Sequence, residues 1–293
     1  MSISYIPYEK RIPDSQYQDR LKFILEHGVL VKETPQGVGA ITCFGELAPM
    51  VFDLSNGVPL ITERKMAWRK PIAEITAFVN GARTIDEINA YGCNFWDDYR
   101  GKGTGFGLEP DDLGPGSYGA AFHDFPMTDG GTFNQFEHLI TQIKQYAGMR
   151  THLVTPWIPF YTGRGENRKV VVAPCHGWVH CRVFGNALCL LMWQRSADFP
   201  IGVPNNMIQY AALLLMVAKA TGLRPWKFIH QFGDAHVYED QIDSVRELIK
   251  RKPFVFPTLH LNASVSDFFS VRVEHFTLQE REAHPAISIP YRP

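Results

Sequence analysis

Polar residues at capping positions, each followed by periodically spaced apolar residues, predict two helices in the first half of the chain. Thr84 and Glu87 have the spacing of a capping box ahead of Ile88. Thr132 and Gln135 repeat that spacing. The apolar stripe that accompanies this second cap ends before Gly148 and consists of Phe133, Phe136, Ile140 and Ile143.

A buried helix and a hairpin are predicted further along. Residues 207–221 are apolar nearly all round and stop at Gly222, which is typical of a core helix. The runs 178–184 and 187–193 are rich in strand-forming residues, and the Gly185-Asn186 pair between them predicts a two-residue hairpin.

Helices and strands intermix without a strict βαβ alternation. We therefore predict one α/β (α+β) domain over residues 1–293, with a mixed β-sheet and packed helices. Two loops rich in Gly and polar residues, 100–117 and 161–169, have lengths that usually indicate a functional or mobile segment.

Composition excludes several classes of protein. Apolar residues make up 45% and charged residues 20% of 293, and the formal net charge is −1, so the chain as a whole is not attracted to nucleic acid or anionic membrane. Five cysteines cannot all pair, which favours a reducing compartment. The N-terminus lacks an apolar signal region, and the most apolar run, 207–218, is too short to span a bilayer. We therefore expect a cytoplasmic location.

The cysteine at position 175 is the main candidate for chemistry. It follows the apolar run 170–172, which predicts that it lies at the end of a strand. A lone cysteine is usually a small buried apolar residue. A Cys-His protease is a further alternative, but neighbours in a strand point to opposite faces, which argues against His176 as the base. The predicted hairpin would return Arg195 to Cys175, where a guanidinium lowers a thiol pKa and can hold a phosphate.

Eight segments together resemble the thymidylate synthase family, from about residue 20 to the C-terminus. The segments are RKPIAEI (69–75), NFWDD (94–98), LGPGSYG (113–119), APCH (173–176), QRSAD (194–198), GVPNN (202–206), GDAHVY (233–238) and RKPFVFPTL (251–259). Each is weak alone, and their order and spacing carry the resemblance.

The resemblance implies a catalytic group. Cys175 would add to C6 of the base and so make C5 nucleophilic, with Arg195 depressing the thiol pKa. Glu74 would remove the C5 proton through ordered water, and burial on an apolar helix would raise its pKa. Without the family context, Glu74 could equally be an ordinary exposed glutamate. Tyr118, on the family's tyrosine loop, would complete the group.

The resemblance also implies a nucleotide site and a folate site. Asn206 would read uracil, because its amide both donates and accepts. His236 and Tyr238 would bind the sugar 3′-hydroxyl, although His236 alone could be structural. The remaining nucleotide residues would be Gln194, Arg195, Ser196 and, from a homodimeric partner, Arg150. For 5,10-methylenetetrahydrofolate the candidates are Trp96, Phe95, Asp198, Gly202, Arg64 and Lys65, of which the last two could be a solvated basic turn.

The chain departs from the family pattern at four places. Pro35 stands where the family's phosphate loop has arginine, and Thr151 replaces the second arginine of the partner's pair. Asn205 replaces an aromatic residue, and the tail 289–293 lacks the usual aliphatic character. Each lost phosphate cation would cost about 1.5–3 kcal/mol. Possible replacements are Lys32, Arg164, Arg168 and Arg292.

Three functions follow from these patterns. The first is methylation of dUMP to dTMP, with 5,10-methylenetetrahydrofolate as carbon and hydride donor. A deoxyuridylate hydroxymethyltransferase would share every step but the last. A catalytically silent nucleotide- or RNA-binding relative would not need a nucleophile and a base together. We expect a dUMP-like nucleotide and folate as ligands, and no metal, membrane or required nucleic acid.

Overall fold

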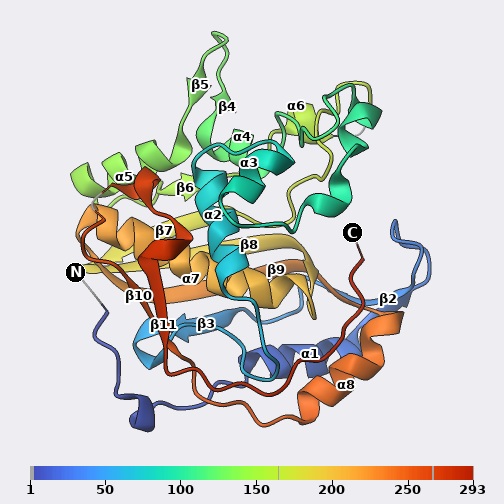
Figure 1. Ribbon diagram of the computed structural model, residues 1–293, viewed down its shortest axis with the longest axis vertical. Helices are drawn as coiled ribbons and strands as arrows, with labels where there is room; N and C mark the ends of the chain where they lie inside the picture. Colours follow the sequence, from blue (N-terminus) through green and yellow to red (C-terminus); the bar gives the residue numbers. More distant parts are fainter. Residues whose placement is uncertain (1–2, 164, 266, 293) are drawn as a thin grey trace.

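The computed structural model describes residues 3–163, 165–265 and 267–292, and its centre is a mixed sheet of seven strands (Figure 1). The main-sheet strands are β1 (Val29–Val31), β2 (Ala40–Phe44), β3 (Met50–Asp53), β6 (Leu153–Val154), β7 (Trp178–Phe184), β8 (Ala187–Asp198) and β9 (Arg224–Tyr238). They follow the order β1-β2-β9-β8-β7-β6, and β3 pairs with β9 next to β2. Two small hairpins are formed by β4 (Phe125–Pro126) with β5 (Thr132–Phe133) and by β10 (Thr258–Leu261) with β11 (Phe276–Gln279).

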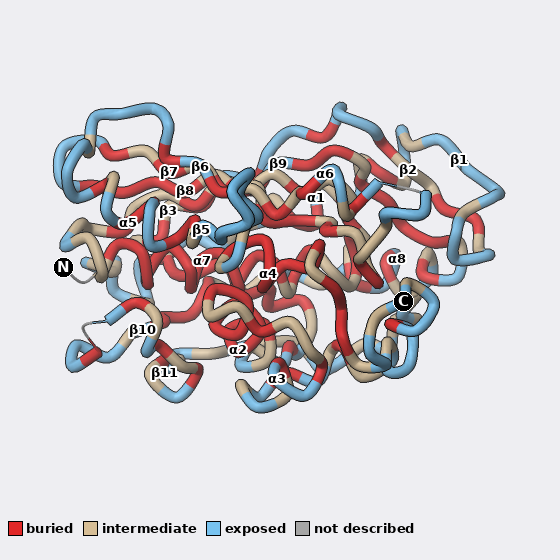
Figure 2. Tube along the Cα trace, turned by 90° about the horizontal axis from the view of Figure 1, so that it is seen from above, coloured by how far each residue is buried: buried red, intermediate tan, exposed pale blue. Residues whose placement is uncertain are grey.

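One long helix fills the core between the sheet and a second layer of helices. The helices are α1 (Gln16–His27), α2 (Arg69–Val79), α3 (Ile85–Ala90), α4 (Tyr118–His123), α5 (Gln135–Gln145), α6 (Pro159–Thr162), α7 (Gly202–Thr221) and α8 (Ile242–Lys250). Helix α7 packs on β8 and β9 and is covered by α2. Figure 2 shows β7 and β8 on one side of α7 and α2 and α3 on the other. This layering buries α7 nearly all round, which explains its unbroken apolar sequence.

The only parallel pair in the main sheet, among the described residues, is β8 with β9. The other described pairs are antiparallel. The sheet is therefore mixed, and the chain forms the single α+β domain that the sequence predicts.

The hairpin and two of the helices agree with the sequence analysis. Strands β7 and β8 pair from Trp178↔Trp193 to Phe184↔Ala187, so Gly185-Asn186 is the two-residue turn. Thr84 Oγ1 accepts the backbone N–H of Glu87 at 3.2 Å and the Glu87 carboxylate accepts that of Thr84 at 2.9 Å, a complete capping box. Helix α7 ends at Gly222 as predicted but begins five residues earlier, at Gly202, which places Asn206 within it.

Two local predictions are wrong. Thr132 does not cap a helix: it lies in β5, and Asn134 caps α5 by accepting two backbone N–H groups. Residues 170–172 form no strand, so Cys175 lies in an irregular segment before β7. Side chains hold this segment in place of a strand partner, since Arg195 donates to the carbonyls of Ala173 and Pro174.

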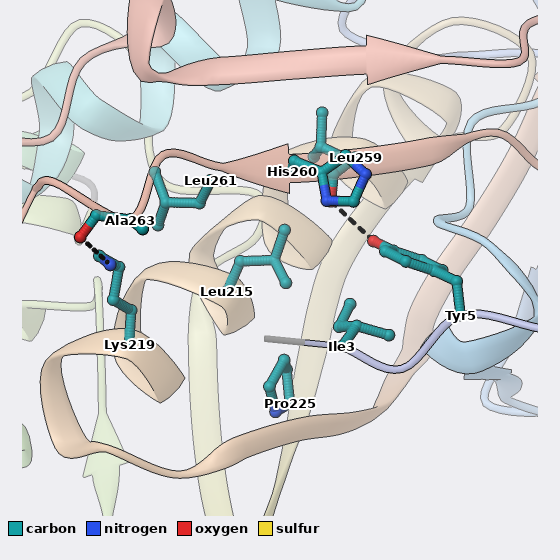
Figure 3. Close-up of a pocket in the computed structure, with 9 residues that line it drawn as sticks. All are labelled: Ile3, Tyr5, Leu215, Lys219, Pro225, Leu259, His260, Leu261 and Ala263. Atoms are coloured by element: carbon teal, nitrogen blue, oxygen red, sulfur yellow. Dashed lines mark hydrogen bonds between the residues drawn. The ribbon is translucent and has the colours of Figure 1, made fainter. Parts of the chain in front are cut away.

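A cavity of about 260 Å³ lies between the N-terminal segment, α7 and β10 (Figure 3). Its lining is mainly apolar, two of its polar groups bind backbone carbonyls, and the His260 ring packs edge-on against Tyr5. The Tyr5 hydroxyl donates to the Leu259 carbonyl at 2.7 Å, and Lys219 Nζ donates to the Ala263 carbonyl at 2.9 Å. This cavity therefore presents no reactive group.

Candidate active site

A larger cavity, of about 780 Å³, opens over the end of β8 and contains the candidate nucleophile. Five of the predicted site residues line it: Cys175, Arg195, Ser196, His236 and Tyr238. The topology explains this convergence. The irregular segment before β7 returns to the end of β8 through the hairpin, and β8 and β9 run side by side in parallel, with Asp198 opposite His236.

Arg195 lies beside Cys175, as the hairpin predicts. Its Nη2 is 3.6 Å from the Cys175 Sγ, and its backbone N–H donates to the Cys175 carbonyl at 2.7 Å. The guanidinium also stands over the ring of Trp157, 5.5 Å from the centroid. Several contacts therefore fix the cation next to the sulfur.

The expectation of a depressed thiol pKa is wrong. Burial raises the pKa of Cys175 above its ordinary value, and the Arg195 charge and a hydrogen bond with Ser196 offset only part of that effect. The sulfur is therefore mainly a thiol at neutral pH.

Tyr118 and His176 support the nucleophile without sharing its proton. The Tyr118 hydroxyl accepts the backbone N–H of Cys175 at 2.7 Å, and the two rings of Tyr118 and His176 stack with centroids 4.5 Å apart. His176 Nδ1 faces the Tyr210 hydroxyl at 2.7 Å, and burial lowers the His176 pKa to about 3. His176 is thus neutral and directed away from the thiol.

Glu74 is buried, so the alternative of an ordinary exposed glutamate is wrong. Trp96 Nε1 donates to its Oε1 at 2.7 Å, and Gln209 Nε2 donates to its Oε2 at 2.7 Å. Asn206 Nδ2 in turn donates to Gln209 Oε1 at 2.8 Å. Burial raises the pKa of Glu74 to about 7, against the effect of the two hydrogen bonds. A carboxyl group with that pKa can take and return a proton near neutral pH.

Of the remaining nucleotide-site candidates, His236 and Tyr238 line the cavity, and Gln194 and Arg150 do not. His236 Nδ1 bonds to the Asp234 carboxylate at 2.6 Å, which fixes its ring beside that of Tyr238. Gln194 is buried between His230 and the Ser196 carbonyl and does not line the cavity. Arg150 is exposed and does not line it either.

The folate-site candidates lie outside the cavity lining. Burial raises the pKa of Asp198 to about 6, and Gln241 Nε2 donates to the Asp198 carboxylate at 3.4 Å. Trp96 packs against Tyr99, a cavity residue, with centroids 5.4 Å apart. The others are dispersed: Gly202 begins α7, Arg64 donates to the Pro200 carbonyl, Phe95 lies beneath Lys70, and Lys65 is exposed.

No group of three or more His, Cys, Asp or Glu side chains among the described residues could hold a metal ion. The described cysteines, which are all five, are unpaired. None of the described helices combines the length and apolarity needed to cross a bilayer.

The model of the family described as "Thymidylate synthase" matches residues 15–292. The chain belongs to the thymidylate synthase family. It is therefore an enzyme that transfers a one-carbon unit to C5 of a pyrimidine, in a family that uses a folate cofactor.

Of the four departures from the thymidylate synthase pattern, Pro35 lies at the cavity and one is the tail, whereas Thr151 and Asn205 do not line the cavity. Residues 34–36 line the cavity, so Pro35 occupies its edge without a charge. Of the candidate replacement cations, Lys32 pairs with Glu239 at 2.8 Å and Arg292 pairs with Asp240. Arg164 lies outside the described residues. Arg168 lines the cavity.

Gln209 is the residue that the sequence analysis missed. It is fully buried, and it connects Asn206, the candidate for reading the base, to Glu74. A polar residue inside the apolar run of α7, one helical turn after Asn206, was the available signal.

Proposed function

We propose that this member of the thymidylate synthase family converts dUMP to dTMP with 5,10-methylenetetrahydrofolate. The observation that carries the proposal is the pairing of two groups. A thiol stands beside a fixed guanidinium at Cys175, and a buried carboxyl group with a pKa of about 7 is hydrogen-bonded, through Gln209, to an amide that can read uracil. A silent binding protein needs neither the nucleophile nor the base.

In this mechanism the thiol releases its proton to solvent as the Cys175 sulfur bonds to C6, and the electron pair of the C5–C6 bond moves toward O4. Arg195 favours the anionic sulfur, and Asn206 donates to the developing charge at O4. The nucleophilic C5 would then bond to the one-carbon unit that folate supplies. Glu74 would take the C5 proton, directly or through water, and the sulfur would leave C6 with its electron pair as a hydride reaches the new carbon, which restores the C5–C6 double bond.

The residues on the folate side fit the cofactor's chemistry. Asp198 is a buried carboxyl group with weak partners at 3.4 Å, suited to the N–C–N edge of a pterin, and Trp96 offers an aromatic surface next to Glu74. When bound, the folate would supply the one-carbon unit and, for a methyl product, the hydride.

The tail supports methylation over hydroxymethylation. The Pro290 carbonyl accepts from Gln241 Nε2 at 2.9 Å, and the Tyr291 hydroxyl lies 3.4 Å from that of Tyr99. The tail is therefore held against residues that adjoin Asp198 and Trp96, despite its altered sequence. A closed tail keeps water from the site, as hydride transfer requires.

The test is to incubate the enzyme with dUMP and 5,10-methylenetetrahydrofolate and to follow dihydrofolate absorbance and nucleotide mass. We expect dihydrofolate to appear in step with a nucleotide of the mass of dTMP. Hydroxymethyl-dUMP without dihydrofolate would replace the proposal by the hydroxymethyltransferase. No change in either compound would reject both.

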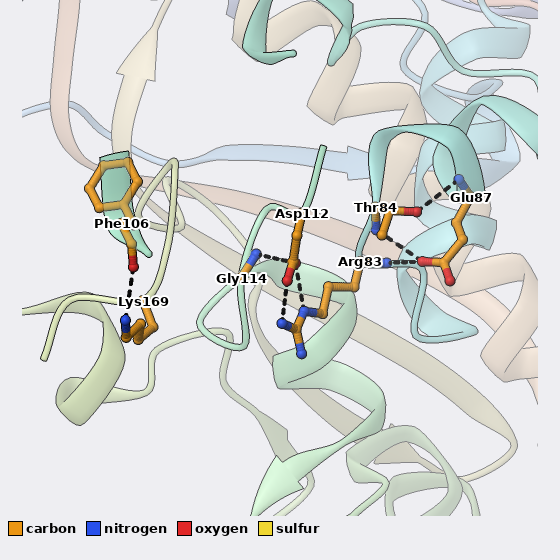
Figure 4. Close-up of polar contacts among 7 residues, drawn as sticks. All are labelled: Arg83, Thr84, Glu87, Phe106, Asp112, Gly114 and Lys169. Carbon is orange, nitrogen blue, oxygen red and sulfur yellow. Dashed lines mark hydrogen bonds and ion pairs between the residues drawn. The ribbon is translucent and has the colours of Figure 1, made fainter. Parts of the chain in front are cut away.

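We further propose that Arg168 is a ligand of the nucleotide phosphate. It and Arg195 are the only Lys or Arg residues among those that line the cavity in the described part of the chain. The Arg168 guanidinium stands 4.6 Å from the Phe106 ring centroid and donates to the carbonyls of Val170 and Val171 at 3.3 Å. The Nζ of the neighbouring Lys169 donates to the Phe106 carbonyl at 2.9 Å (Figure 4). These contacts hold the cation at the cavity without neutralising it.

Arg168→Ala should weaken dUMP binding about 10- to 100-fold, the worth of one charge-assisted hydrogen bond. Binding of deoxyuridine, which has no phosphate, should change less than about twofold because its contacts are retained. Both are measured by titration calorimetry, with Arg246→Ala, an exposed arginine of α8, as the control. Equal losses for nucleotide and nucleoside would assign Arg168 a structural role instead.

A homodimer is also part of the proposal. Arg150 is exposed and does not line the cavity of its own chain, as expected of a residue that serves a partner. Exposed apolar side chains on the main sheet offer a contact surface: Val29, Leu30, Val31, Phe44, Val51, Leu153 and Phe184. Sedimentation should give twice the chain mass at assay concentration. An active monomer would contradict this arrangement.

A further inference from the structure

Resting on the proposed function, we propose that Gln209 is a positioning residue that fixes the orientation of the Asn206 amide and thereby selects uracil over cytosine. The inference concerns base specificity, and it arises from a buried chain of hydrogen bonds that crosses from α2 to α7.

Trp96 determines, at one end of this chain, which groups donate and which accept. An indole nitrogen can only donate, so Glu74 Oε1 must accept from it, and the bond length is 2.7 Å. When Glu74 is ionised, as its role as a base requires, its carboxylate only accepts, so Glu74 Oε2 requires a donor as well. Gln209 must therefore turn its NH₂ group to Glu74, which it does at 2.7 Å.

The orientation of Gln209 then dictates that of Asn206. With its NH₂ group on Glu74, Gln209 presents its carbonyl oxygen to Asn206, and only the Asn206 NH₂ group can satisfy that oxygen. Gln209 and Asn206 are three residues apart on α7, so they share one helix face. The bond is 2.8 Å long, and Gln209 has no exposed surface.

The Asn206 amide thus has one oxygen and one N–H left to bind a base, and Gln209 fixes the positions of these two groups. Uracil offers the complement, since its N3–H donates and its O4 accepts. Cytosine offers the reverse, because its N3 accepts and its amino group donates. Turning the Asn206 amide by half a turn would suit cytosine, but it would bring two oxygens together at Gln209 in a buried place. Gln209 therefore makes the flipped amide costly.

Without Gln209 the two orientations of Asn206 become closer in free energy. An unsatisfied buried polar group typically costs enough to change an equilibrium about 5- to 150-fold. Gln209→Leu should therefore lower the ratio of dCMP to dUMP dissociation constants by about that factor. A role in packing alone would weaken both nucleotides equally and leave the ratio unchanged.

The experiment measures dUMP and dCMP binding to the full-length chain by titration calorimetry. Gln209→Leu is compared with Met216→Leu, a swap at another buried position of the same helix that does not touch the chain of hydrogen bonds. Gln209→Met, which keeps the side-chain length, serves where the leucine variant does not fold. As a second readout, kcat for dUMP should fall with little change in KM, since Glu74 loses a donor.

The proposal is supported if the ratio of dCMP to dUMP dissociation constants falls in the Gln209 variant but not in Met216→Leu. A ratio within about twofold of the wild type in a variant that binds dUMP overturns it and leaves the proposed function intact. A wild-type protein that binds neither nucleotide overturns both, so the two failures are distinguishable.

Discussion

Replacing Cys175 with alanine is expected to lower turnover by at least about 10⁴-fold while the protein stays folded. Loss of the nucleophile removes the covalent bond to C6, and nothing else in the cavity can replace it. Among the five cysteines only Cys175 lines the cavity, and the other four are buried in the core. The effect on stability should be small, because the change removes a single sulfur atom from a side chain that lines the cavity.

Cys189→Ala is the matched control for that variant. It removes a buried thiol from β8, the strand that also carries Arg195, and this thiol does not line the cavity, so it cannot reach the nucleotide there. Initial rates with saturating dUMP and cofactor should be near normal in Cys189→Ala. A normal rate in Cys175→Ala would end the covalent mechanism.

Glu74→Gln should lower kcat by about 10²- to 10⁴-fold, the usual contribution of a positioned general base. In the wild type, kcat should rise with pH through about 7, because the carboxyl group acts as a base only after it has lost its proton. Glutamine cannot titrate, so the variant should lose this ionisation from its pH–rate profile.

Glu63→Gln is the control variant. It tests whether replacing any buried carboxyl group removes the ionisation from the pH–rate profile. Burial also raises the pKa of Glu63, whose carboxylate accepts the Thr62 backbone N–H at 2.8 Å, but it belongs to no chain that reaches Asn206. Its pH–rate profile should match the wild type. Retention of the ionisation near pH 7 in Glu74→Gln would assign that group to another residue.

The raised pKa of Glu74 also predicts the effect of its replacement on stability. Between the ordinary glutamate pKa of 4.5 and the raised pKa of about 7, the folded protein keeps a proton that the unfolded chain releases. Folding stability from this group is therefore fully present below that window and is lost as pH rises through it. Since glutamine does not titrate, Glu74→Gln should lose this fall in stability between pH 4.5 and 7, as measured by denaturant unfolding at several pH values.

The sequence predicts the fold best where neighbours along the chain determine the structure. The Gly185-Asn186 turn, the Thr84 capping box and the end of α7 at Gly222 each depend on a few adjacent residues. The proximity of Arg195 to Cys175 follows from the hairpin alone. The prediction of a strand at 170–172 is wrong because strand-forming residues need a partner strand. This run is instead held by the Arg168 side chain and by one backbone hydrogen bond to Leu113.

Other features depend on groups that only the folded chain brings together. Asn134 caps α5 because its side chain accepts two backbone N–H groups of the helix. The spacing of residues in the sequence could not show that Asn134 is a better cap than Thr132. The thiol pKa depends on whether burial outweighs the Arg195 charge, and no pattern reports that balance. Arg292 was a candidate phosphate ligand until the structure paired it with Asp240.

The central claim, that the Cys175 sulfur bonds to the base, is tested most directly by the mass of the protein after reaction with 5-fluoro-dUMP and 5,10-methylenetetrahydrofolate. This analogue has no C5 proton for Glu74 to remove, so the reaction should stop with the nucleotide attached. We expect a stoichiometric adduct that peptide mapping places on Cys175 and on none of Cys43, Cys93, Cys181 and Cys189. An enzyme that turns over dUMP yet forms no adduct, or forms it elsewhere, would contradict the account.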